Sequence, residues 1–202
     1  MVETITGRQR TLARAISIVS NPALITLAAI FYTASLLAPD RSRFWIWSWL
    51  AIGLILSPGL LYGFWTLVKK RHFDLEIGKR QDRIVPLLLS SLGALIGSYL
   101  VSSRLEVGVL SILSTALAMM LISLTIITLV WKISLHTATA ASYITLIVLF
   151  GGWAFTVCYL ILLPIGWSRL VLNQHTLAQI IGGALAAVGV TSVAWLMFAA
   201  RV

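Results

Sequence analysis

Long apolar segments alternate with short polar loops along the whole chain. The apolar segments are six in number and cover about 23–38, 44–68, 86–101, 108–131, 137–165 and 173–199. A helix needs about 20 apolar residues to cross the hydrocarbon core of a bilayer, so most of these segments are long enough to span a membrane. We therefore expect a single transmembrane domain over residues 1–202, an all-α bundle of six to seven transmembrane helices.

The segment from 137 to 165 decides the topology. It is too long for one straight span and too short for two full ones. Gly151 and Gly152 stand near its middle, and a glycine pair is typical of a tight turn. The sequence therefore predicts two short helices, 137–150 and 153–166. With this hairpin, three polar loops emerge on one membrane face, at 69–83, 132–136 and 167–175.

Composition supports a membrane location and limits the partners. Hydrophobic residues make up 59% of the chain, charged residues make up 10%, and the mean hydropathy is +0.99. The net charge of +9 comes mainly from loops, which favours the membrane bilayer with its anionic headgroups over nucleic acid as the partner. The single cysteine, Cys158, lies in an apolar segment and excludes a disulfide within the chain.

The basic residues also predict the orientation. Residues 1–20 form a basic N-terminal segment with Arg8, Arg10 and Arg14, and because no convincing cleavage site follows, we expect this segment to be retained. Of the 15 Lys and Arg residues, eleven lie on the face that would carry the three polar loops. The positive-inside rule then predicts that this face of the cell membrane is cytoplasmic.

The polar segment 167–179 lies between two apolar segments and holds groups that are costly beside lipid unless they are used. If a helix starts near Asn173, His175 and Gln179 share one helical face, and the amide can reach the imidazole. Arg169 would lie at the mouth of that helix, where a guanidinium and free backbone N–H groups bind anions. The pattern predicts a phosphate site with a candidate nucleophile.

These residues resemble the third motif of the type 2 phosphatidic acid phosphatase superfamily, which is Ser-Arg, five residues, His, three residues, Asp. Ser168, Arg169 and His175 match the motif at the right spacing, and Gln179 stands at the place of the Asp. Together with Thr176, the run His-Thr-x-x-Gln resembles the polyprenyl diphosphate phosphatases of the superfamily. This resemblance favours an isoprenoid diphosphate as substrate.

The other two motifs of the superfamily are matched less closely. Ser134 and His136 resemble the Ser and His of the second motif, Pro-Ser-Gly-His. A shifted form of the first motif, which is Lys, six residues, Arg-Pro, is similar to the arrangement of Lys79, Arg83 and Pro86. The first two motifs therefore lie within 69–136 and the third within 167–179.

The resemblance implies a membrane lipid phosphatase that hydrolyses a lipid phosphate or isoprenoid diphosphate through a phosphohistidine, without metal or cofactor. By position, His175 would be the nucleophile and His136 the general acid. Gln179 would fix the tautomer of His175 but, unlike an Asp, would supply no charge. The residues that would bind phosphate are Lys79, Arg83, Ser134 and Arg169.

Other functions stay open. Gln179, Leu135 and the irregular first motif are also typical of an inactive relative that binds phospholipid or isoprenoid phosphate. A small membrane transporter is a further alternative, and the oligomeric state is undetermined. Asp74, Glu76 and Asp82 form the one acidic cluster, and neighbouring Lys and Arg can pair with it, so we expect no metal site.

Overall fold

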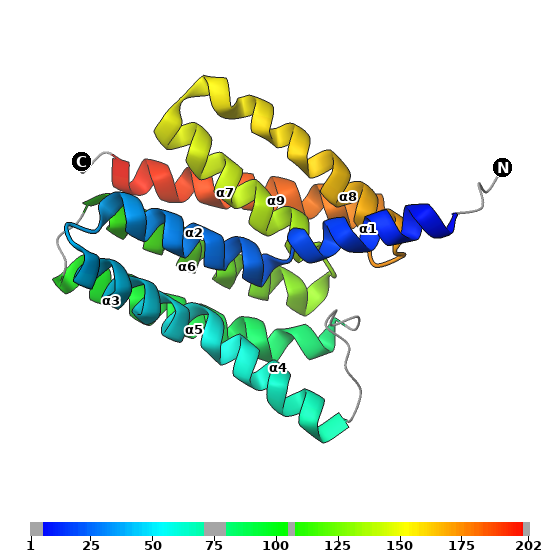
Figure 1. The fold of residues 1–202 in the computed structure, drawn as a ribbon, viewed down its shortest axis with the longest axis horizontal. Helices are drawn as coiled ribbons and strands as arrows, with labels where there is room; N and C mark the ends of the chain where they lie inside the picture. The colour runs from blue at the N-terminus through cyan, green and yellow to red at the C-terminus, as the bar shows by residue number, and fades with distance from the viewer. Residues whose placement is uncertain (1–5, 71–79, 105–107, 200–202) are drawn as a thin grey trace.

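The computed structural model describes residues 6–70, 80–104 and 108–199, and every regular element in these ranges is helical (Figure 1). The α-helices are α1 (Gly7–Val19), α2 (Pro22–Leu37), α3 (Arg41–Ala51), α4 (Ser57–Lys70), α5 (Ile84–Arg104), α6 (Gly108–Val130), α7 (Leu135–Gly151), α8 (Leu162–Val171) and α9 (Leu177–Ala199). Three shorter elements join them: the π-helix η1 (Ile52–Leu56) and the 3-10 helices η2 (Gln81–Arg83) and η3 (Trp153–Ile161).

Several of these helices are long and apolar enough to cross a membrane. In the described ranges five stretches qualify: Arg41–Trp65, Gln81–Ser103, Leu110–Val130, Trp153–Val171 and Leu177–Met197. The pair α1 and α2, bent by 41°, makes a sixth candidate, and α7 is a shorter apolar helix. The predicted all-α, multi-pass membrane fold is therefore confirmed.

The predicted turn at the glycine pair is present and reverses the chain. α7 ends at Gly151, and Gly152 adopts φ 95°, a left-handed conformation that a residue without Cβ adopts readily. η3 and α8 then pack back along α7, as Figure 1 shows, and the Thr145 hydroxyl hydrogen-bonds the Tyr159 hydroxyl at 2.7 Å. The returning helix is longer than predicted and ends at Val171 instead of 166, with a 3-10 first half.

One span contains a break that the sequence prediction did not include. The helix predicted over 44–68 is interrupted by η1, which runs directly into Ser57 and Pro58. Because Pro58 has no N–H, the carbonyls one turn earlier lose a backbone donor, and the Ser57 hydroxyl donates to the carbonyl of Gly53 instead. The resulting irregular wall lines a cavity described below.

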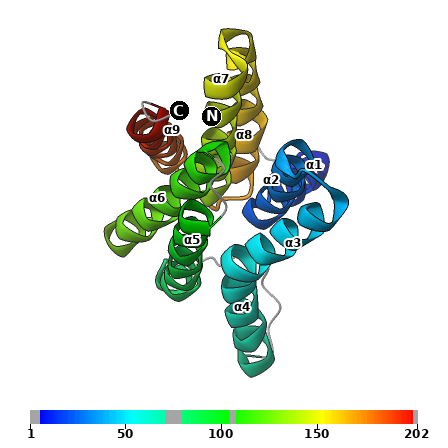
Figure 2. The ribbon, with the colours of Figure 1, turned by 90° about the vertical axis from the view of Figure 1, so that its left-hand side faces the viewer.

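The helix ends that carry the predicted motifs gather at one end of the bundle. Figure 1 places the C-terminal end of α4, the start of α5, the α6–α7 connection and the α8–α9 connection together at this end, which we call the site end. Figure 2, which looks along the bundle, shows α7 and α8 on one side and α4 on the other, with α2, α5 and α6 between them. The predicted meeting of the loops on one face is therefore confirmed for the described residues.

Candidate functional site

Two of the predicted motifs are joined directly where α7 and α9 begin. The backbone N–H of Ser134 donates to the carbonyl oxygen of Gln179 at 3.1 Å, and the Thr137 hydroxyl donates to the carbonyl oxygen of Ile180 at 3.2 Å. The two helix starts approach so closely because of Gly183. A Cβ built on this glycine would lie 2.8 Å from the carbonyl oxygen of Ser134.

The loop that carries His175 is tied to the end of α8. The carbonyl oxygen of Arg169 accepts hydrogen bonds from the N–H of Gln174 at 3.0 Å and of His175 at 3.4 Å. Asn173 takes a left-handed conformation with φ 54°, which Asn tolerates better than most residues. The prediction that a helix starts near Asn173 is therefore wrong by a few residues, since α9 begins at Leu177.

Gln179 has two partners that together define the tautomer of His175. Its Oε1 accepts the backbone N–H of Thr176 at 3.2 Å, while the Thr176 hydroxyl accepts the N–H of Gln179 at 3.3 Å, as in a capping box. The same Oε1 lies 3.1 Å from Nδ1 of His175, as predicted. Because a backbone N–H can only donate, the side-chain atom facing it is the oxygen, and Nδ1 must carry the proton. The lone pair of His175 is then on Nε2.

His175 is buried and its imidazole is neutral at physiological pH. Burial lowers its pKa to about 3, and the positive charges of Arg83, Lys132 and Arg169 act in the same direction. The hydrogen bond with Gln179 opposes this shift. Burial and the neighbouring positive charges therefore keep the imidazole neutral, the form in which Nε2 can accept a hydrogen bond or act as a nucleophile.

Arg83, Lys132 and Arg169 form a cationic cluster around His175. The two arginines of this cluster are almost completely buried. Arg169, at the end of α8, is 1% exposed, and its Nη1 donates to the hydroxyl of Ser17 in α1. Arg83, in η2, is 6% exposed, and its Nη1 donates to the carbonyl oxygen of Ile133 at 3.4 Å. Buried arginines are rare in proteins and are retained where a charge is used.

Ser134 and His136, the two polar residues of the second motif, have different positions in the structure. Ser134 is fully buried at the N-cap of α7, where its hydroxyl accepts the N–H of Thr137 at 3.4 Å. The hydroxyl that was predicted to bind phosphate thus caps a helix, and Ser134 is not among the residues that line the cavity. His136, in the first turn of α7, is buried and does line it.

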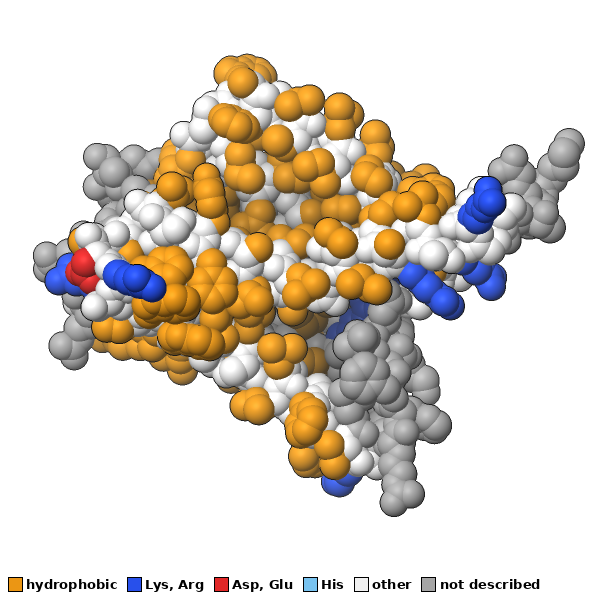
Figure 3. Space-filling view, in the orientation of Figure 1, with side chains coloured by type: hydrophobic (Ala, Val, Ile, Leu, Met, Phe, Trp, Pro, Cys, Tyr) orange, Lys and Arg blue, Asp and Glu red, His pale blue; other side chains and the backbone are white. Residues whose placement is uncertain are grey.

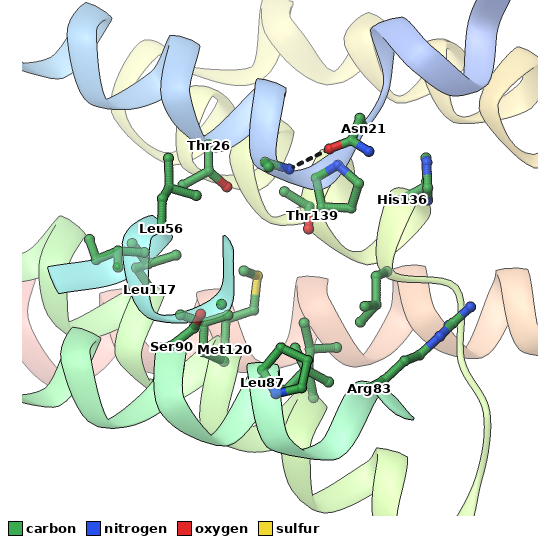
Figure 4. A pocket seen from close by; sticks show the side chains of 18 of the residues that line it. Asn21, Thr26, Leu56, Arg83, Leu87, Ser90, Leu117, Met120, His136 and Thr139 are labelled. Carbon is green, nitrogen blue, oxygen red and sulfur yellow. Dashed lines mark hydrogen bonds between the residues drawn. The ribbon is translucent and has the colours of Figure 1, made fainter. Parts of the chain in front are cut away.

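A cavity of about 330 Å³ extends from this cluster into the bundle. Arg83 and His136 lie at one end of it, and Leu56, Leu117 and Met120 lie toward the other (Figure 4). Arg169 also lines it, and none of the described lining residues is Asp or Glu. The cavity therefore has a cationic end, and the rest of its lining is mainly apolar with a few neutral polar side chains such as Thr26 and Ser90, which suits an amphiphilic anion.

His175 stands beside the cationic end of the cavity without lining it. The charges of Arg83 and Arg169, which belong to the cavity wall, both act on its imidazole. Lys132, which the resemblance did not include, acts on it as well and so joins the cluster. Lys79, the remaining predicted phosphate ligand, lies outside the described residues.

Two residues of the site had no part in the sequence prediction. Ser17 contacts Arg169 from α1, and Asn21, at the N-cap of α2, lines the cavity. Neither belongs to a motif, and the only local signal was that Asn21 precedes a proline, as an N-cap often does. Among the residues that the structure describes, no group of three or more His, Cys, Asp or Glu side chains is placed to bind a metal.

The fold and the site together define a class of protein. It is a multi-pass α-helical membrane protein with a buried cationic cluster, two histidines and a cavity at one end of its bundle. Comparison with protein-family models, with curated proteins and with solved structures finds no match for this chain.

Proposed function

We propose that this protein is a membrane lipid phosphatase, which hydrolyses a lipid phosphate or an isoprenoid diphosphate through a phosphohistidine and without a metal. One observation carries the proposal: His175 is kept neutral by its burial and by the charges of Arg83 and Arg169, which also line the cationic end of a mainly apolar cavity, while Gln179 leaves the imidazole lone pair on Nε2. Such a site combines a nucleophile with groups that stabilise phosphoryl charge.

The reaction follows from the roles of these side chains. Nε2 of His175 attacks phosphorus as the bond from phosphorus to the leaving oxygen breaks, and His136 gives that oxygen its proton. Water then attacks the phosphohistidine, the N–P bond breaks, and His136 takes the proton from the water. Arg83 and Arg169 balance the charge of the phosphoryl oxygens throughout.

Gln179 limits the range of substrates. It orients His175 through Nδ1, but it adds no negative charge to balance the imidazole as the N–P bond forms. A site of this kind works best when the leaving group is good. Among lipid phosphates, the terminal phosphate of an isoprenoid diphosphate fits this condition better than a simple phosphomonoester.

The cavity supports a lipid as the substrate. Its apolar part is lined from α2, η1, α4, α5, α6 and α7, so that a hydrocarbon tail can lie among these helices while the phosphate meets Arg83 and Arg169. The basic side chains at the site end favour a cytoplasmic position for this end in a cell membrane. Soluble polyanions such as nucleic acids do not fit a cavity of about 330 Å³ inside the bundle.

A second function is favoured by one specific observation. Gln179 completes a capping box with Thr176, which gives the glutamine a structural task that requires no catalysis. A protein that only binds lipid phosphates would retain the two arginines and the cavity. It would not need the tautomer of His175.

Phosphate release by the purified full chain in nanodiscs separates the two functions. With an isoprenoid diphosphate and a chelator, the hydrolase releases phosphate, and His175→Ala reduces the rate by roughly 1,000-fold or more. Gln174→Ala is the matched control, because the hydrogen bond of this neighbour to Arg169 comes from its backbone N–H, which the substitution retains. Release at equal rates from the wild type and His175→Ala would exclude the hydrolase, and retained binding of the diphosphate would then favour the binder.

A further inference from the structure

α1 combines a basic surface with a buried contact to the site. It packs on α8 through its buried face, which includes Ala13 and Ser17. Arg8, Arg10 and Arg14 are exposed, and α1 contains no acidic residue. Figure 3 shows several basic side chains on α1, where this helix extends past the bundle at the site end.

α1 carries its arginines beyond the apolar helix that follows it. α2 is apolar, and α1 is bent by 41° from it at Ser20 and Asn21 and extends toward the site end. Leu12, Ile18 and Val19 are also exposed on α1. A helix that exposes both arginines and apolar side chains suits the boundary between acyl chains and headgroups.

The same helix holds one of the two buried arginines of the site. The hydroxyl of Ser17 accepts a hydrogen bond from Nη1 of Arg169, and both side chains are buried. A displacement of α1 would therefore move a partner of Arg169. Arg8 and Arg10 lie in the first turn of this helix of 13 residues, Arg14 lies near its middle, and Ser17 lies in its last turn.

We propose that α1 binds the anionic lipid headgroups of the membrane face on which the site opens, and that this binding keeps Ser17 against Arg169. Three arginines on one short helix complement a negatively charged lipid surface, and each adds to the attraction. The headgroups are thus a structural partner of the protein, separate from any substrate in the cavity. The inference does not depend on phosphatase activity, because it concerns α1 and its contact with α8.

Hydrogen exchange of the full chain in nanodiscs tests the binding of α1. Discs of phosphatidylcholine alone are compared with discs that also contain phosphatidylglycerol. We expect α1 amides to exchange roughly tenfold or more slowly in the anionic discs at low salt, and the difference to shrink at high salt. The triple variant Arg8→Gln, Arg10→Gln, Arg14→Gln should lose the difference.

The matched control is the double variant Arg41→Gln, Arg43→Gln, which removes exposed arginines at the opposite end of the bundle. It should retain the slower exchange of α1 in anionic discs. Equal exchange of α1 in both kinds of disc would overturn the proposal, and so would a lipid difference that persists in the triple variant.

The coupling of α1 to the site has its own readout. The N–H groups of Gln174 and His175 both donate to the carbonyl of Arg169, so their exchange reports on the end of α8. We expect both amides to exchange more slowly in anionic discs, and Ser17→Ala to abolish this effect while α1 itself still responds to the lipid. If Ser17→Ala leaves the lipid effect at these two amides intact, the contact with Arg169 does not transmit it.

Discussion

Ser134 donates its backbone N–H to the carbonyl oxygen of Gln179, and this bond of 3.1 Å joins the first residues of two helices that are far apart in the sequence. It fixes His136, two residues beyond Ser134, relative to His175, four residues before Gln179. The geometry of both histidines therefore depends on how closely α7 and α9 approach. That approach can be changed by single substitutions.

Gly183→Ala should disrupt the junction of α7 and α9. The new Cβ would lie 2.8 Å from the carbonyl oxygen of Ser134, which is backbone and cannot move without shifting α7. We expect a loss of about 1 to 3 kcal/mol of stability, together with loss of phosphate release. Thermal unfolding in detergent measures the loss of stability, and an activity assay measures the loss of phosphate release. Gly189→Ala is the control, because its Cβ meets nothing within 4 Å; equal effects of the two variants would contradict the steric explanation.

Gln179→Ala should separate the tasks of this side chain when it is compared with Thr176→Ala. Both variants break the capping box and should lower the stability by about 1 kcal/mol. Only Gln179→Ala also removes the acceptor of His175 Nδ1, and we expect it to reduce kcat by roughly tenfold or more. Thermal unfolding and kcat are measured for both variants, so that the effect on stability is separated from the effect on catalysis. A similar kcat for the two would mean that Gln179 does not position the nucleophile.

Acid should destabilise the protein through His175. Its pKa is about 3 in the folded chain and 6.5 when unperturbed, so between these values the unfolded chain binds more protons than the folded one. The contribution of His175 to the free energy of unfolding is therefore fully present above pH 6.5 and is lost as the pH falls toward 3. Melting temperatures measured across this range should show the decline, and His175→Gln should reduce it. A slope that is unchanged in His175→Gln would assign the effect to other groups.

Arg83 should be more important for activity than for folding. Arg83→Gln removes a charge from the cavity wall and should lower kcat by roughly 100-fold or more, and it should also raise the pKa of His175. Arg80→Gln is the control, because Arg80 donates to the carbonyls of Thr128 and Leu129 at the end of α6. Measurements of kcat and of the pH dependence of kcat/KM distinguish Arg83→Gln from Arg80→Gln. Equal loss of kcat in both variants would point to a general disturbance of the fold.

Filling the apolar part of the cavity should affect substrates according to their tails. Leu117→Trp adds bulk to the wall away from Arg83, so we expect KM for a long-chain isoprenoid diphosphate to rise severalfold. Hydrolysis of a small soluble phosphate ester should change little. Val193→Trp, on an exposed face of α9, controls for the added indole. An equal effect of Leu117→Trp on both substrates would place the lipid tail elsewhere.

The parts of the site that the sequence predicted are those set by local spacing. His175 and Gln179 contact each other at the predicted spacing of four residues, although His175 precedes α9, and Gly152 makes the turn that the glycine pair indicates. The contact between Arg169 and Ser17 spans 152 positions and belongs to no periodic pattern. No local rule predicts such a contact, since it depends on how α1 packs against α8.

The helix irregularities did not follow from the apolar pattern, although the sequence contains local signals for them. Apolar periodicity indicates where a span lies, but it does not distinguish an α-helix from the π-helix η1. Pro58 was the signal for that break, because it removes a backbone donor inside the span. The late start of α9 was signalled in the same way by Thr176 and Gln179, which form the capping box.

The contact between Ser17 and Arg169 joins two residues that are synthesised far apart in time, since 152 positions separate them. α1 leaves the ribosome well before α8, so Ser17 has to wait for its partner until the chain has turned back at the glycine pair and α8 has been made. The buried charged centre therefore cannot be complete before the last third of the chain has been synthesised.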